Sequence, residues 1–335
     1  MRSVDTADGI IELGYAFRSA KALMSAVELG VFTVLAEQSL DRDTLRQRIG
    51  LAERGAADFL DALVALGLLH RDGSGRYANA PGAGRYLDAR KPGYIGGLLE
   101  NLAAREYGMW ETLTDALRTG KPQTGFEAAH FRQLYADRER LRTYAKGMTG
   151  GSRSVAEALA AKFPWGQYRT FADIGTSQGC VPVQIASAHT HLTGCGFDLP
   201  VLAAMFKDYV DCSRCSDRLR FVPGDFFADP LPTADVLILG RVLHNWDLPT
   251  KRMLLEKAHD ALPQGGALIV YERMIDDERR ASRTGMLSSL NMLIMTDGGF
   301  DFTAADCIGW MRDAGFAETR TERLVDDHVM VVAIR

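Results

Sequence analysis

Glycine and aspartate residues follow the predicted strands in the second half of this chain, where a parallel sheet would gather them at one edge. The first of these strands ends in Asp173-x-Gly175-x-x-x-Gly179. Gly175 lets a ligand approach the backbone, and the helix that begins after the turn presents free amide groups. One glycine-rich turn is a weak signal, so its meaning depends on the strand ends that follow.

Carboxylates stand at the next two strand ends. Asp198 lies in Phe197-Asp198-Leu199-Pro200, where it can accept two hydrogen bonds from a ribose diol. Asp225 lies in Gly224-Asp225-Phe226-Phe227, where an acid can accept a hydrogen bond from an adenine amino group beside a ring that faces the base. Three such strand ends in register are much more specific than one, and they predict a nucleotide-type cofactor site.

The spacing excludes two common phosphate-binding motifs. A G-x-G-x-x-G fingerprint that starts at Gly175 would need glycine at Ser177 and Cys180, and no Gly-Lys-Ser or Gly-Lys-Thr follows to form a Walker loop. His244 follows the fourth predicted strand, in Gly240-Arg241-Val242-Leu243-His244-Asn245. This position places it at the same edge as the cofactor site, whereas the other histidines are expected to be structural.

Alternating strands and helices must position these residues. Strands are predicted at 170–174, 192–197, 219–222, 235–239 and 267–271. Helices between most of them, such as one over 251–262, are typical of an α/β, Rossmann-like fold in which a parallel sheet carries helices on both faces. After a helix over 303–314, segments 318–324 and 329–334 are expected to close the sheet as an antiparallel hairpin.

The first hundred residues predict a winged helix. Helices and a final hairpin are predicted, in order, over 9–35, 43–49, 53–66 and 68–77. Asp43 and Thr44 are expected to cap the second helix. A winged helix is also found in DNA-binding regulators, but residues 53–61, the recognition helix of such a protein, carry three acidic groups and one arginine. Phosphate contacts need the opposite balance, so a dimerisation role fits better.

Composition limits the partners. The 335 residues carry a net charge of -4, which gives no basic field for nucleic acid. No apolar run approaches the ~20 residues that span a bilayer, and the start lacks a signal-peptide core, so a cytoplasmic protein without a membrane partner is expected. The five cysteines are scattered, and Cys212 and Cys215 lack further zinc ligands nearby.

Together with the residues after the fourth strand, these strand ends resemble those of the class I S-adenosylmethionine-dependent methyltransferases. More narrowly, the chain is similar over nearly its whole length to the small-molecule O-methyltransferases, which include plant caffeate-type enzymes and bacterial natural-product tailoring enzymes. The resemblance implies S-adenosylmethionine as cofactor and a homodimer formed through the N-terminal domain. It implies a winged-helix dimerisation domain over 1–98, a helical linker or lid over 99–166 and a catalytic domain over 167–335.

The resemblance also assigns the cofactor contacts. Gly175 and the loop after it would hold the methionyl part, Asp198 the ribose hydroxyls, and Asp225 with Phe226 the adenine. The full set of implied cofactor-binding residues is Asp173, Gly175, Gly179, Asp198, Leu199, Asp225, Phe226, Gly240 and Arg241. The chain departs from the family where Ser177 replaces a usual glycine and where Gly240 replaces the lysine of some relatives.

Methyl transfer to a phenol needs a base. A phenol with a pKa of ~10 is mostly protonated at neutral pH, while a histidine near ~6.5 is mostly free to accept its proton. The resemblance implies that His244 is this base, although Asn245 stands where aspartate is common. Glu272 and Asp301 match carboxylates that flank the family's histidine and can stabilise an imidazolium. A strand-end surface acid and a helix N-cap are their alternative interpretations, and which of them supports His244 stays open.

Substrate contacts are implied by analogy at Trp110, Met148, Asn291, Met292 and Met295, for which core packing is an equal alternative. No metal cluster is visible in the sequence, so metal-dependent methylation is not expected. The sequence therefore predicts an O-methyltransferase for a phenolic hydroxyl of a small aromatic or polyketide-type metabolite, with His244 as base. The alternatives are methylation of a ring carbon, a relative that retains the cofactor without transferring its methyl group, and a winged-helix DNA-binding regulator.

Overall fold

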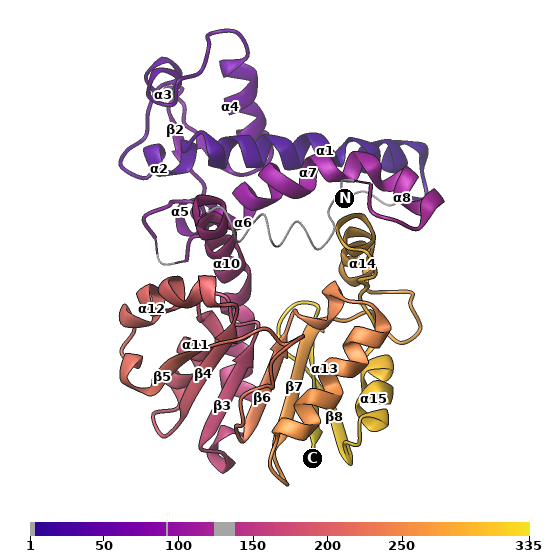
Figure 1. The fold of residues 1–335 in the computed structure, drawn as a ribbon. Helices are drawn as coiled ribbons and strands as arrows, with labels where there is room; N and C mark the ends of the chain where they lie inside the picture. The colour runs from indigo at the N-terminus through magenta and orange to yellow at the C-terminus, as the bar shows by residue number, and fades with distance from the viewer. Residues whose placement is uncertain (1–3, 92, 124–137) are drawn as a thin grey trace. The chain divides into compact units, whose positions relative to one another are not determined.

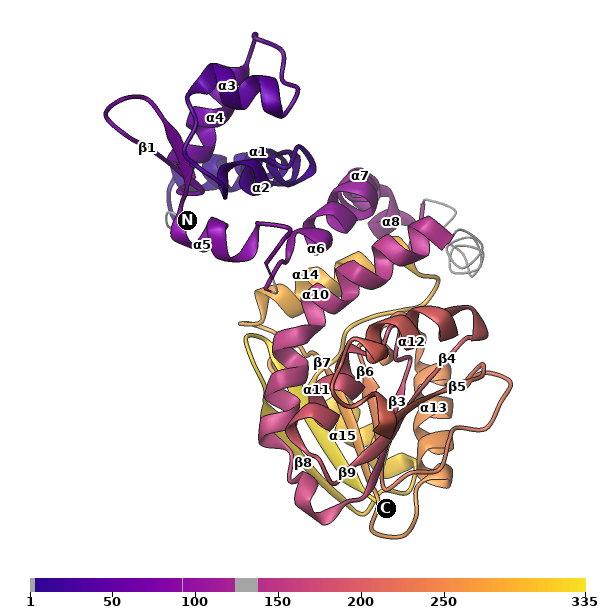
Figure 2. The same ribbon diagram turned by 90° about the vertical axis from the view of Figure 1, so that its left-hand side faces the viewer.

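The computed structural model describes residues 4–91, 93–123 and 138–335 (Figure 1, Figure 2). The chain groups into two compact units, Met1–Gly108 with Lys146–Gly151, and Met109–Ala145 with Ser152–Arg335. These units are defined by contacts between residues and not by function. The predicted domain boundaries after residues 98 and 166 therefore stay a prediction.

A mostly parallel sheet forms the centre of the second unit (Figure 1). Over the described ranges its strand order is β5-β4-β3-β6-β7-β9-β8, and β9 runs antiparallel to both of its neighbours. The strands are β3 (Thr170–Ile174), β4 (Thr193–Asp198), β5 (Leu219–Pro223), β6 (Val236–Gly240), β7 (Ala267–Arg273), β8 (Glu318–Arg323) and β9 (His328–Ile334). The predicted parallel sheet closed by an antiparallel hairpin is confirmed.

Helices cover both faces of this sheet because its buried strand residues alternate between the faces. Phe171 and Ile238 pack on one side with the second half of α10 and with α11 and α12, whereas Ala172 and Leu237 pack on the other side with α13 and α15. These helices are α10 (Arg138–Lys162), α11 (Cys180–Ala188), α12 (Ala203–Asp211), α13 (Leu248–Ala261) and α15 (Ala304–Asp313). The strand ends that carry the predicted site therefore stand on a core that is closed on both sides.

Shorter elements connect the strands of the second unit. They are η2 (Trp110–Thr112), α8 (Leu113–Thr119), η3 (Trp165–Gln167), η4 (Pro200–Leu202), η5 (Ser216–Arg218), η6 (Leu243–Asn245) and the longer α14 (Arg283–Met295). Helix α13 begins before the predicted residue 251, because the side chain of Asp247 caps it by accepting a hydrogen bond from the Thr250 amide at 3.0 Å. Pro249 lies in the first turn, where a missing amide proton costs nothing.

The first unit contains the predicted helices followed by a hairpin. Its elements are α1 (Ala7–Glu28), α2 (Val31–Leu35), α3 (Arg42–Arg48), α4 (Ala56–Ala65), β1 (Leu69–Arg71), β2 (Tyr77–Asn79), α5 (Pro81–Tyr86), α6 (Gly96–Asn101) and the π-helix η1 (Leu102–Glu106), with α7 (Tyr107–Met109) at its boundary. Asp72 fixes the hairpin turn, because its Oδ1 atom accepts hydrogen bonds from the amides of Ser74 and Arg76, both at 2.9 Å.

Two predictions for the first unit are wrong in detail. The single helix expected over 9–35 breaks at Gly30, whose left-handed φ of 70° separates α1 from α2. The cap of α3 is Asp41 rather than Asp43 or Thr44, since the Asp41 side chain accepts a hydrogen bond from the Thr44 amide at 2.9 Å. Among the helices with described residues, none has both the length and the apolar character required to cross a bilayer.

Candidate active site

The glycine turn after β3 has the backbone conformation that its sequence predicts. Gly175 and Gly179 have left-handed φ angles of 77° and 91°. A β-carbon on Gly175 would lie 2.8 Å from Cγ2 of Val242, in the loop after β6. Glycine is therefore required here for two reasons, its φ angle and the close approach of the next loop. Ser177 shares the left-handed region with a φ of 54°, a conformation that is uncommon for serine.

The Asp198 carboxylate organises this turn from the end of β4. Its Oδ2 atom accepts a hydrogen bond from the Ser177 amide and its Oδ1 atom accepts one from the Leu199 amide, each at 2.8 Å. Burial raises the pKa of Asp198 to about 6, and burial also raises the pKa of nearby Asp173 to about 7. Each Asp198 oxygen retains acceptor capacity, so the carboxylate can still bind a diol.

The polar groups of the turn fit the amino-acid part of the expected cofactor. The hydroxyl oxygen of Ser177 is buried and has no hydrogen-bond partner among the described residues. The turn leads directly into the start of α11, and the N-terminal end of a helix favours negatively charged groups. An orphan hydroxyl and a helix start next to Asp198 suit a carboxylate-bearing ligand such as S-adenosylmethionine.

Aromatic rings stand beside Asp225, the residue expected to face the adenine. Phe226 is half-buried, and its ring centroid lies 5.8 Å from that of Trp246. Phe227 is 47% exposed and lies 4.8 Å from the same tryptophan ring. Both phenylalanines are thus candidates for the adenine contact, whereas the sequence had indicated only Phe226. Trp246 was not predicted as a site residue.

Gly240 ends β6 under a buried tyrosine that sequence reasoning missed. A β-carbon on Gly240 would lie 2.1 Å from the ring of Tyr271 on the neighbouring strand β7. Arg241 follows with a left-handed φ of 56°, and its amide donates a hydrogen bond to the Tyr271 carbonyl at 3.0 Å. Tyr271 therefore fills the volume above Gly240 where some relatives carry a lysine side chain.

His244 lies in η6, directly after these residues, and faces two carboxylates. Its Nδ1 atom is 3.4 Å from Oδ1 of Asp301 and 3.7 Å from Oε2 of Glu272. The His244 amide also donates a hydrogen bond to Oε1 of Glu272 at 3.3 Å. All three side chains are buried. The structure thus brings together the three residues that were predicted to carry catalysis.

Two glycines allow the loop of Asp301 to reach the loop of His244. A β-carbon on Gly299 would lie 2.6 Å from the His244 carbonyl oxygen, and one on Gly298 would lie 2.8 Å from Cβ of Asp247. The amide of Asp301 then donates a hydrogen bond to Oγ of Ser289 in α14 at 3.2 Å. Backbone packing and α14 therefore fix the position of this carboxylate.

Burial and the two neighbouring carboxylates have opposite effects on the pKa of His244. Burial lowers the pKa, but the charge of Glu272 and the hydrogen bond and charge of Asp301 outweigh burial, so the pKa is raised above its ordinary value. Burial raises the pKa of Glu272. With both carboxylates at Nδ1, the proton of the neutral imidazole is held on that atom, and Nε2 is left as the acceptor.

The same three residues form a possible metal-binding set that the sequence did not reveal. One ligand atom each from His244, Glu272 and Asp301 lies within 4.8 Å of the others. The expectation that no metal takes part stays a prediction. A positive charge is already close by, because the fully buried Lys251 lies near both carboxylates.

Four of the predicted substrate-binding residues lie in the second unit. The indole Nε1 of Trp110 donates a hydrogen bond to Oδ1 of Asn291 at 3.0 Å, and Nδ2 of Asn291 lies 3.0 Å from Sδ of Met295. Helix α14, which carries Asn291, Met292 and Met295, contacts both η2 and η6. Met292 and Met295 are mostly buried. Met148 belongs to the first unit, so it is not placed with the other four.

Lys251 was missed as well, although its spacing carried a signal. Lys251, Leu254, Leu255 and Ala258 follow the i, i+3, i+4, i+7 pattern of one buried helix face. Lysine is exposed in most helices, so the sequence alone did not indicate that the first residue of this pattern is buried.

Family models and individual proteins match this chain. A model of an O-methyltransferase domain matches residues 110–317, and a model of an O-methyltransferase dimerisation domain matches residues 11–89. The tetracenomycin polyketide synthesis 8-O-methyl transferase of Streptomyces glaucescens is 44% identical over 93% of this chain and 92% of its own length. An N,N-dimethyltransferase of Streptomyces rimosus is 37% identical over 96% of this chain and 94% of its own.

A solved structure extends the match to three dimensions. Human N-acetylserotonin methyltransferase in complex with S-adenosylmethionine superposes with a TM-score of 0.90, at 25% identity, over 100% of this chain and 99% of that one. The matched regions contain the glycine turn, both carboxylate strand ends and the histidine cluster.

Proposed function

The chain belongs to the S-adenosylmethionine-dependent O-methyltransferase family, and from that premise we propose that it methylates a phenolic hydroxyl of a small aromatic or polyketide-type metabolite, with His244 as general base. The observation that carries the proposal is the buried imidazole whose Nδ1 atom faces Asp301 at 3.4 Å and Glu272 at 3.7 Å. A base of this kind is what a neutral phenol requires before its oxygen can act as a nucleophile.

The chain's residues divide the chemistry between them. Bound S-adenosylmethionine supplies the electrophilic methyl group, and Asp198, the 175–179 turn and the Asp225 loop would hold it. His244 accepts the phenolic proton on Nε2 and becomes an imidazolium. Glu272 and Asp301 stabilise that cation through Nδ1 and fix the orientation of the ring. Trp110 and Asn291, joined by their hydrogen bond, would bind the acceptor near the base.

Methylation of nitrogen is a second candidate, because one relative at 37% identity is named as an N,N-dimethyltransferase. An amine that arrives protonated also needs a base, so the same His244 would serve either reaction. The relative with higher identity is named as an 8-O-methyl transferase of polyketide synthesis, which favours oxygen as the acceptor.

A turnover screen with methyl-¹³C-labelled S-adenosylmethionine tests the proposal. The acceptors are polycyclic phenols, each paired with an otherwise identical compound that bears an amine or lacks the hydroxyl. The proposal expects a new carbon resonance in the methoxy region, formed only from the hydroxylated member of each pair. A resonance in the N-methyl region would instead show methylation of nitrogen, and one in the aryl-methyl region would show methylation of a ring carbon. Label that never leaves the cofactor would exclude methyl transfer.

We also infer that the chain dimerises through the first three turns of α1. Five large apolar side chains there are each at least half exposed: Ile10, Ile11, Leu13, Tyr15 and Phe17. They occupy more than one face of the helix, and a helix that is apolar on several faces is normally buried. This segment overlaps the start of the matched dimerisation domain, so a second copy of the chain is the partner that we propose.

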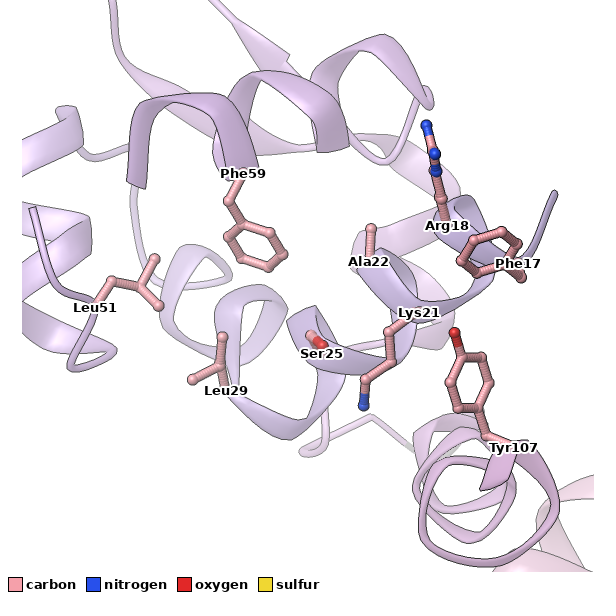
Figure 3. Close-up of a pocket in the computed structure, with 9 residues that line it drawn as sticks. All are labelled: Phe17, Arg18, Lys21, Ala22, Ser25, Leu29, Leu51, Phe59 and Tyr107. Carbon is pink, nitrogen blue, oxygen red and sulfur yellow. The ribbon is translucent and has the colours of Figure 1, made fainter. Parts of the chain in front are cut away.

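Two further features support this partner. A hollow of about 400 Å³ adjoins the segment within the first unit and is lined mainly by apolar side chains, with Lys21 and Arg18 at its edge (Figure 3). Gly14 lies inside α1, where glycine costs ~1 kcal/mol relative to alanine. Apart from the neighbouring backbone of α1 itself and the two residues next to Gly14, no described atom lies within 4 Å of a β-carbon built there. An antiparallel α1 crossing at Gly14 would explain the glycine and would bring Asp8 towards Lys21 of the partner subunit.

A further inference from the structure

Lys251 carries a charged group into the interior of the second unit. Its residue exposure is 0%, although it lies in the first turn of α13, a place where lysine usually reaches solvent. Burying an ammonium group is costly unless hydrogen bonds and opposite charges compensate. The groups that compensate the buried charge of Lys251 therefore indicate its role.

One partner of Lys251 belongs to the loop of His244. The Nζ atom donates a hydrogen bond to the carbonyl oxygen of Trp246, two residues after His244. The Lys251 amide also donates to the Asp247 carbonyl at 3.0 Å. Both bonds hold the chain between His244 and α13 in one conformation.

The other partners belong to the loop of Asp301. Nζ lies 3.5 Å from the ring centroid of Phe300 and 5.6 Å from that of Phe302, the residues on either side of Asp301. A buried ammonium over an aromatic face is attracted by the ring quadrupole, and the attraction increases when water is excluded. Lys251 thus contacts the two loops whose approach places Asp301 beside His244.

We propose that Lys251 is a positioning residue for the reaction: its ammonium, bound to the Trp246 carbonyl and seated over the Phe300 ring, holds the His244 loop to the Asp301 loop and places a positive charge next to this junction. The inference rests on the proposed role of His244 as general base. Without the Lys251 ammonium, a protonated His244 would be the nearest positive charge to the buried carboxylates of Glu272 and Asp301. The imidazole would then bind its proton too tightly to act as a base.

The charges around the cluster support this role. The charges of Glu272 in β7, Asp301 in the loop before α15 and Asp247 at the cap of α13 act on Lys251, and the charge of Arg241 acts on His244 together with the two acids. Burial lowers the pKa of Lys251 to about 8, while these three carboxylates act against that effect. Removing the ammonium takes a positive charge away from the surroundings of His244 and would therefore raise the proton affinity of the imidazole.

The test compares Lys251→Met, which keeps a straight side chain for packing but loses the charge, with Lys251→Arg, which keeps the charge. Lys207→Met is the matched control, because it makes the same change on the exposed surface of α12 in the same unit. Titration of ¹³C-labelled histidine by NMR, with the His244 signal assigned from its loss in His244→Asn, follows the base without substrate. The pH profile of kcat provides the second readout.

We expect Lys251→Met to raise the apparent pKa of His244 by about one unit, a roughly tenfold gain in proton affinity, and to move the acidic limb of the kcat profile by the same amount. Lys251→Arg should restore most of the wild-type titration, and Lys207→Met should leave it unchanged. A Lys251→Met protein that loses turnover but titrates like the wild type would overturn the charge role and leave only packing.

A second variant covers the case in which Lys251→Met does not fold. Phe300→Leu removes the ring and keeps the ammonium, so it should lower kcat several-fold without moving the acidic limb. Unchanged kcat in a folded Phe300→Leu protein would overturn the role of Lys251 in holding the loops. The proposed function fails by a different result, full turnover in His244→Asn, and the NMR titration does not depend on it.

Discussion

The Nδ1 atom of His244 lies 3.4 Å from the Oδ1 atom of Asp301, although 56 residues lie between them in the chain. This distance is longer than the ~2.7–2.9 Å of a charge-assisted hydrogen bond. Contacts of this kind often shorten when the reacting complex forms. The pair is therefore arranged to strengthen as positive charge develops on the imidazole.

Replacing His244 by alanine or asparagine should remove the base and leave the cofactor site intact. We expect kcat to fall by about 10²–10⁴-fold, the usual contribution of a positioned general base. The affinity for S-adenosylmethionine, measured by calorimetry, should stay near the wild-type value. Equal turnover in the variant and the wild type would remove His244 from the reaction.

Asp301→Asn and Glu272→Gln should separate the contributions of the two carboxylates. Each acid raises the pKa of His244, so either change should lower that pKa and shift the acidic limb of kcat/KM to lower pH. At the optimum pH, kcat should fall by about tenfold or more, since one unit of pKa corresponds to ~1.4 kcal/mol of lost stabilisation. The carboxylate whose loss causes the larger fall is the main support of the imidazolium.

The raised pKa of His244 also determines at which pH the wild-type enzyme should lose activity on acidification. Because the pKa of His244 is raised, the base is protonated at pH values where an ordinary histidine is still neutral. The fall of kcat/KM on acidification should therefore begin above ~6.5. An acidic limb centred well below this value would contradict the contribution of the carboxylates.

Gly299→Ala should impair the site without touching any reacting group. Its β-carbon would lie 2.6 Å from the His244 carbonyl oxygen, so one of the two loops must move. We expect a fall in kcat of at least tenfold and a lower Tm. Gly309→Ala is the control, because the new β-carbon would meet no described atom within 4 Å outside the adjoining part of α15, and alanine favours the helix by up to ~1 kcal/mol. A neutral Gly299→Ala would mean that the loops tolerate a larger separation.

Leu13→Asp should dissociate the proposed dimer. The side chain is 50% exposed in one copy, so a carboxylate there costs the isolated chain little but would be buried in the α1 interface. Analytical ultracentrifugation should show a monomer, or a dimer at least tenfold weaker. Leu66→Asp introduces the same charge at the C-cap of α4, a site that is 42% exposed and lies outside the α1 segment, and should remain dimeric. An unaffected Leu13→Asp dimer would place the interface elsewhere.

The strand ends could be predicted because they depend on local spacing. Gly240 pairs with Tyr271 across neighbouring strands, so His244 and Glu272, which follow them closely, had to meet at one edge of the sheet. The glycine turn and Asp198 were predictable for the same reason. Asp301 required the family resemblance, since its position depends on a loop that no strand register fixes.

The buried partners of the site could not be predicted from local patterns. Strand alternation predicts on which face of the sheet the Tyr271 side chain lies. It does not predict that the ring fills the space above Gly240, because this depends on the absence of a side chain at position 240 of the neighbouring strand. Lys251 is buried because two rings from a loop about 50 residues further along the chain approach it. Such compensation is a property of the tertiary structure.

The contact between Gly240 and Tyr271 also restricts how the protein can evolve. A β-carbon at position 240 would lie 2.1 Å from the ring of Tyr271, which is buried in the close-packed interior, so any side chain there requires this ring to move. We therefore expect a lysine at position 240 to be accepted best together with a smaller residue at position 271. The two positions are therefore coupled, and a mutant library that samples position 240 alone would record it as invariant although it can vary together with position 271.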